Sequence, residues 1–169
     1  MAGQITCDLS PWTDELERLG GGCINAATQA VYSGAGVMVK AYAGAVNDIA
    51  TAPFSYAAGG SSRQASPEEK EALSGCPNLF GISKHTKEGL KVQASVGVNN
   101  SAGYFNGGPW ANKGKGVPLP MLMRSIEHGT SFRKAQPVLR RAANRAQTSV
   151  NSAMAKGADE ALDRLANNS

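Results

Sequence analysis

The residue types that usually carry out catalysis are scarce in this sequence. There are two histidines, His85 among lysines in an expected strand and His128 at an expected turn. Ser125, Glu127 and His128 are too close in sequence to constitute a catalytic triad by themselves. The GxSxG, HExxH, GxxxxGK[ST] and strand-linked GxGxxG motifs are missing from the sequence. We therefore predict that the chain is not an enzyme, with a hydrolase of unfamiliar site as the alternative.

Side chains that could bind a metal or a cofactor show no recognisable spacing. The adjacent pairs Glu68-Glu69 and Asp159-Glu160 lie in expected helices, where a solvated face is the usual explanation. Gly114-Lys115-Gly116 lacks the spacing and the following Ser or Thr of a phosphate-binding loop. The odd set of cysteines without CxxC spacing argues against a disulfide framework or a zinc site and favours a reducing cytosol; its members are Cys7, Cys23 and Cys76. We expect no cofactor and no metal.

Positive charge is concentrated in the C-terminal part of the chain. Residues 1–104 carry seven Lys/Arg and nine Asp/Glu, whereas residues 105–169 carry ten and four. Basic clusters neutralise phosphates, so a nucleic-acid-binding module is one hypothesis. No helix-turn-helix, zinc-finger, RRM or OB signature accompanies these residues. We therefore prefer a solvated face, or a face complementary to an acidic protein partner.

The first half of the chain is predicted to contain two helices. Ser10-Pro11 starts a short amphipathic helix, which the glycines at 20–22 end. Residues 23–50 place apolar side chains at spacings of three, four or seven, which predicts a long helix. The glycines inside this helix imply close packing against another helix or a sheet; they are Gly34, Gly36 and Gly44.

A hairpin is predicted in the middle of the chain, after a loop at residues 57–66 and a short helix that Ser66 caps. Its strands cover residues 79–98, and the second strand alternates apolar and polar residues strictly. Residues 99–116 are too glycine-rich for a regular element and predict a long loop or arm. Residues 121–126 fit either a strand or a helical turn.

The last predicted element is a helix over residues 137–166, which Pro137 opens and Gly157 bends or splits. These elements predict an α+β fold in one domain, residues 1–169. A small antiparallel or mixed sheet with the hairpin packs against the long helix of the N-terminal half and the C-terminal helix. No segment approaches the roughly 20 apolar residues that span a bilayer, and no signal peptide is evident at the N-terminus.

Residues 126–142 carry a family resemblance. The segment Ile-Glu-His-Gly-Thr at 126–130, followed by Pro137, an apolar pair and a final helix, resembles the C-terminal hallmark of a tail-completion family of long-tailed bacteriophages and prophages. His128 stands where this family usually has an aromatic residue. The roles expected for Glu127, Gly129, Thr130 and Pro137 are structural, because Gly can supply a turn, a Thr hydroxyl can cap one, and Pro can start a helix.

The resemblance implies a structural virion protein, in a hexameric ring that completes the tail and helps to join it to the capsid neck. A tail terminator or head–tail connector component is the alternative within this class. Expected partners are further copies of the chain, the tail terminator, tail tube or connector proteins, and phage DNA by non-specific contact in the lumen. The virion neck is the expected location, after assembly in the host cytoplasm, with no membrane contact.

The expected contact residues are aromatic and basic, because Trp, Tyr and Arg dominate binding hot spots. An equally good interpretation of the aromatic residues is that they pack on the protein's own sheet. The candidate interface residues are Tyr104, Phe105, Trp110, Arg133, Lys134, Arg140, Arg141 and Arg145.

Overall fold

A computed structural model describes residues 3–8, 22–52, 63–85, 91–107, 114 and 116–167. The fold is α+β, as the sequence predicts. Several sequence predictions lie outside the described residues: the helix at 10–19, residues 57–62 of the loop predicted at 57–66, the hairpin connection at 87–89, and Trp110.

The chain forms two compact units, and both long helices contribute to each of them. We call Gly3–Val39, Leu79–Val96 and Ala146–Ser169 the sheet unit. The segments Lys40–Asn78 and Gly97–Arg145 belong to the other unit, which we call the turn unit. The single domain predicted from the sequence stays a prediction.

The sheet unit contains a three-stranded sheet in the order β1-β3-β2. Its strands are β1 (Gly3–Asp8), β2 (Asn78–His85) and β3 (Lys91–Gly97), and β1 runs antiparallel to β3. The predicted hairpin strands are confirmed, and the alternation in β3 has its expected effect, since Val92, Ala94 and Val96 are buried. Strand β1 was not predicted.

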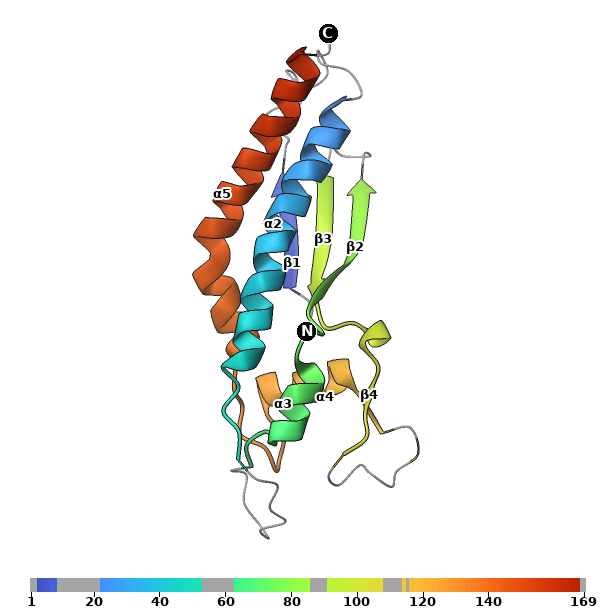
Figure 1. Cartoon of the computed structure of the whole chain (residues 1–169), viewed down its shortest axis with the longest axis vertical. Coiled ribbons are helices and arrows are strands. Elements are labelled where there is room, and N and C mark those ends of the chain that lie inside the picture. Colours follow the sequence, from blue (N-terminus) through green and yellow to red (C-terminus); the bar gives the residue numbers. More distant parts are fainter. Residues whose placement is uncertain are drawn as a thin grey trace. The chain divides into compact units, whose positions relative to one another are not determined.

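Helices α2 (Gly22–Asn47) and α5 (Val138–Asn167) lie side by side in the sheet unit, next to the sheet (Figure 1). A Cβ at Gly34 would collide with the Met154 side chain, and a Cβ at Gly157 would lie 2.5 Å from the Ser33 hydroxyl. Close packing is thus confirmed at Gly34. It is wrong for Gly36 and Gly44, where a Cβ meets no described atom within 4 Å. Helix α5 is continuous through Gly157, so the predicted split is wrong.

The turn unit holds shorter elements around the ends of the long helices. They are α3 (Pro67–Leu73), the 3-10 turn η2 (Asn100–Ala102), the paired strands β4 (Tyr104–Phe105) and β5 (Val117–Pro118), and α4 (Leu119–His128). Figure 1 shows α3 beside α4. Residues 121–126, which fitted either a strand or a helical turn, belong to helix α4. The glycine-rich segment 99–116 contains η2 and β4, so the prediction that it holds no regular element is wrong. The core of this unit includes Tyr42, Val46, Ile49, Leu73, Phe105, Leu122, Met123, Ile126 and Leu139.

The capped short helix is confirmed in detail. The Ser66 hydroxyl accepts the backbone N–H of Glu69 at 3.2 Å, and the Glu69 carboxylate accepts the backbone N–H of Ser66 at 2.9 Å. This reciprocal capping box satisfies two donors at the start of α3, with Pro67 at the first helical position.

Candidate functional site

The residues that carry the family resemblance form the connection between α4 and α5. Gly129 ends α4 with φ 74° and ψ 177°, a backbone conformation that is essentially restricted to glycine. A Cβ at this position would lie 2.8 Å from the carbonyl oxygen of Arg133 and 2.9 Å from the backbone nitrogen of Ala135. Glycine is therefore required here by both conformation and space.

Glu127 caps the start of α5. Its carboxylate is buried, and its two oxygens accept the backbone N–H groups of Leu139 and Arg140, each at 2.9 Å. The first N–H groups of a helix have no partner within the helix, and the helix dipole favours a negative charge at that end. Glu127 thus joins the end of one helix to the start of the next across the Gly129 turn.

A second turn follows Gly129 and is closed by the backbone. The N–H of Thr130 donates to the carbonyl of Arg133 at 2.9 Å, and the N–H of Arg133 donates to the carbonyl of Thr130 at 3.2 Å. The expectation for Thr130 was a capping hydroxyl; within the described residues its backbone groups close the turn instead. The backbone N–H of Gln136 then donates to the carbonyl of Ile126 at 2.8 Å, which folds the connection back onto α4.

A buried ion cluster fixes this connection to α3. The Arg133 side chain is 3% exposed and donates from Nη2 to Oε1 of Glu69 at 2.7 Å, while Nη2 of Arg63 donates to the same oxygen at 2.8 Å. Glu69 is fully buried. Two sequence interpretations need correction here. The carboxylate of Glu69 is not on a solvated face, and Arg133 is not on the surface where we expected an interface residue, because both occupy the interior.

Among the described residues, Oε1 of Glu69 is the carboxylate oxygen that pairs with the buried guanidinium of Arg133. Nε and Nη1 of Arg133 are buried without a hydrogen bond to any described residue. Removing a charged group from water costs several kcal/mol unless a partner compensates it. Glu69 is therefore the group on which burial of Arg133 depends.

Two further side chains hold the end of α2 by contacts that the sequence pattern does not predict. The amide of Gln136 binds Ala50 through both backbone groups, accepting its N–H at 2.9 Å and donating to its carbonyl at 3.0 Å. Nζ of Lys70 donates to the carbonyls of Asn47 at 2.6 Å and Ile49 at 3.2 Å. These bonds satisfy backbone groups at and just beyond the last turn of α2, where no helical partner exists.

Tyr42 is a buried residue whose hydroxyl is influenced by the charge of Glu127. Burial raises the pKa of the Tyr42 hydroxyl, and the negative charge of Glu127 raises it further. Both causes favour the neutral phenol. Burial also raises the pKa of the Cys76 thiol, which donates to the carbonyl of Ala72 at 3.1 Å.

The remaining candidate interface residues divide by exposure. Tyr104 is 56% exposed on β4, whereas Phe105 is 7% exposed and lies in the core, so one aromatic residue of the pair is at the surface and the other packs inside. The exposed basic residues of the set are Lys134, Arg140, Arg141 and Arg145.

Two of the residues that could carry out chemistry lie on α4. The side chain of His128 is exposed at the end of α4, and the hydroxyl of Ser125 donates to the carbonyl of Leu122 at 2.8 Å. His85 is the last residue of β2. Among the described residues, no three His, Cys, Asp or Glu side chains are grouped as they would be for a metal ion. No helix in the described ranges is long and apolar enough to cross a membrane.

No protein-family model, curated protein or solved structure matched the chain.

Proposed function

We propose that this chain is a structural subunit of a long-tailed bacteriophage tail, forming a hexameric ring at the head-proximal end. There it completes the tail and helps to join it to the capsid neck. The proposal starts from the resemblance of residues 126–142 to the tail-completion family. A position as tail terminator or head–tail connector component belongs to the same proposal as its alternative.

The observation that carries the proposal is the structural role of the resembling residues. Glu127 caps α5 with both carboxylate oxygens, and Gly129 adopts a conformation that only glycine readily takes. The motif thus builds a fixed joint between helices. A subunit that acts by shape and contact needs such a joint, and it needs no catalytic group.

The experiment is mass spectrometry of tail and virion particles purified from a culture that produces them. The proposal expects the chain in tail-containing fractions, at a few copies per particle, and in the same gradient fractions as neck proteins. Complete tails without the chain would contradict it. Particles from a strain lacking the gene are expected to contain unjoined heads and tails.

A nucleic-acid-binding module is the second candidate, because Arg140, Arg141 and Arg145 are exposed at the start of α5. Binding that depends on phosphate contacts falls steeply as salt rises. Fluorescence anisotropy with a labelled duplex, measured at 50 and 200 mM salt, separates the candidates. Tight, salt-dependent binding by the chain alone would favour this second function; no binding at micromolar protein would exclude it.

A further inference from the structure

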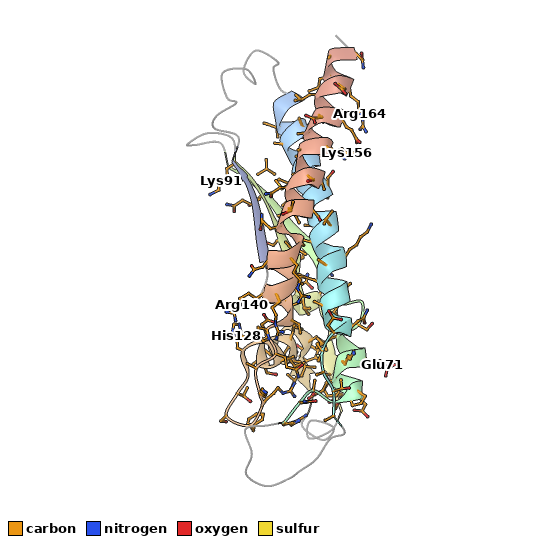
Figure 2. The ribbon with its side chains drawn as sticks, turned by 90° about the vertical axis from the view of Figure 1, so that its left-hand side faces the viewer. Glu71, Lys91, His128, Arg140, Lys156 and Arg164 are labelled. Carbon is orange, nitrogen blue, oxygen red and sulfur yellow. The ribbon has the colours of Figure 1, made fainter. Side chains whose placement is uncertain are left out.

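The turn unit has an exposed face that combines positive charge with an apolar side chain. Met121, Arg124 and His128 are spaced at i, i+3 and i+7 on α4, so they lie on one side of that helix. All three are exposed, and Met121 is 63% exposed. Figure 2 shows His128 and Arg140 on the same side of this unit. We call these four residues the basic face.

The opposite edge of the same unit is acidic. Glu68 and Glu71 are three residues apart on α3 and are both exposed. Figure 2 shows Glu71 on the side away from His128 and Arg140. The bonds of Lys70 to the carbonyls of Asn47 and Ile49 bring the end of α2, including exposed Asp48, next to α3. Asp48, Glu68 and Glu71 form what we call the acidic edge.

We propose that the basic face binds the acidic edge of a second copy of this chain. Charge complementarity selects this occupant, because one compact unit of the chain carries both signs on opposite sides. A contact between two different surfaces of identical subunits repeats head to tail and closes into a ring when the rotation permits. Met121 supplies an exposed apolar contact on the same side of α4 as Arg124 and His128.

This inference rests on the proposed function, since it names the contact through which a ring forms. It explains why the positive charge of α4 and α5 occurs without a nucleic-acid-binding motif. It also assigns the carboxylates of α3 two different roles. Glu69 is buried and stabilises the fold, whereas Glu68 and Glu71 are exposed and bind the neighbouring subunit.

The test uses two charge-reversal variants of the full chain, Glu68→Lys/Glu71→Lys and Arg124→Glu/Arg140→Glu. Sedimentation velocity at several protein concentrations measures association. Each variant alone opposes like charges at every contact, so we expect at least a tenfold loss in apparent association constant. An equimolar mixture restores opposite charges at every contact, and we expect association within threefold of the original chain.

The matched control is Lys91→Glu/Lys156→Glu, which changes the net charge by the same amount as the basic-face variant. Both residues are exposed and belong to the sheet unit (Figure 2). This control is expected to associate as the original chain does. A parallel pair, Glu68→Gln/Glu71→Gln and Arg124→Gln/Arg140→Gln, carries the test if a reversal variant is unfolded by circular dichroism. Each is then expected to weaken association at least threefold.

The outcomes separate the two proposals. If the original chain assembles and the folded reversal or neutralised variants assemble equally well, this contact is wrong while the ring stands. If the mixture of folded reversal variants stays dissociated, the pairing of these two surfaces is wrong. If the original chain does not associate at any concentration, the ring itself is contradicted, and this contact with it.

Discussion

One carboxylate oxygen of Glu69 lies 2.7 Å from the guanidinium of Arg133, and both side chains are buried although 64 residues separate them in sequence. This pair connects α3 to the turn between α4 and α5. It therefore joins the capped short helix to the segment on which the family resemblance depends. The exposed surfaces proposed for assembly are positioned by this interior contact.

Substitution Glu69→Gln is expected to destabilise the protein by about 3–5 kcal/mol, because it leaves Arg133 buried without its compensating charge. Urea denaturation followed by circular dichroism measures the change in the free energy of unfolding. The matched control is Glu71→Gln, which removes an exposed carboxylate from the same helix and is expected to change stability by less than about 0.5 kcal/mol. Equal effects from the two variants would show that the buried pair has no special role.

Substitution Glu127→Ala removes the carboxylate that caps α5 and leaves the N–H groups of Leu139 and Arg140 without that partner. The expected loss is about 1–2 kcal/mol, the upper range for a helix cap, because the lost group is charged and buried. Thermal denaturation and amide hydrogen exchange of the first turn of α5 measure it. Asp159→Ala, an exposed change in the same helix, is the control. Unchanged exchange at Leu139 would contradict the capping role.

Gly129→Ala places a Cβ where the backbone of Arg133 and Ala135 leaves no room, in a conformation that disfavours side chains. We expect a loss of about 1–3 kcal/mol from the conformation alone. The contrasting variant is Gly36→Ala, where a Cβ meets no described atom within 4 Å inside a helix. That change is expected to stabilise by about 0.5–1 kcal/mol. Guanidinium denaturation of both variants gives the comparison, and the same sign for both would refute it.

The raised pKa of Tyr42 predicts a stability change at alkaline pH. The folded protein holds the phenol proton more tightly than the unfolded chain, whose tyrosine titrates near its ordinary value of 10.0. This contribution is fully present below pH 10 and is lost as the pH rises through the higher pKa of the folded state. Urea denaturation at pH 8 and above pH 10 measures it in the original chain and in Tyr42→Phe. At the higher pH the original chain is expected to lose free energy of unfolding relative to Tyr42→Phe. A difference in free energy of unfolding that is the same at both pH values would refute the assignment.

The elements that the sequence predicted correctly are those with local signals. The strict alternation of residues 91–97, the capping box at Ser66 and the periodicity of α2 and α5 depend on neighbours within a few residues. Strand β1 has no comparable signal. It is six residues long and is defined by pairing with β3, about 90 residues away in the chain, which no local pattern reveals.

The candidate site could be predicted only in part, because some of its contacts depend on local sequence and others join distant segments. The structural roles of Glu127 and Gly129 follow from a short motif and its turn chemistry. Arg133 was expected in an interface because arginine is common in binding hot spots, and only the fold brings it to Glu69. The polar contacts of Gln136 and Lys70 with the end of α2 likewise join segments far apart in sequence. Such contacts become visible only once the chain is folded.

The proposed ring is tested most directly by the mass of the purified chain in solution. Size-exclusion chromatography with light scattering, at protein concentrations from about 1 to 200 µM and low salt, measures that mass. A hexameric ring would give a closed species near six times the 17.5 kDa of one chain, visible as a ring by negative-stain electron microscopy. A mass of 17.5 kDa across the whole concentration range would contradict it.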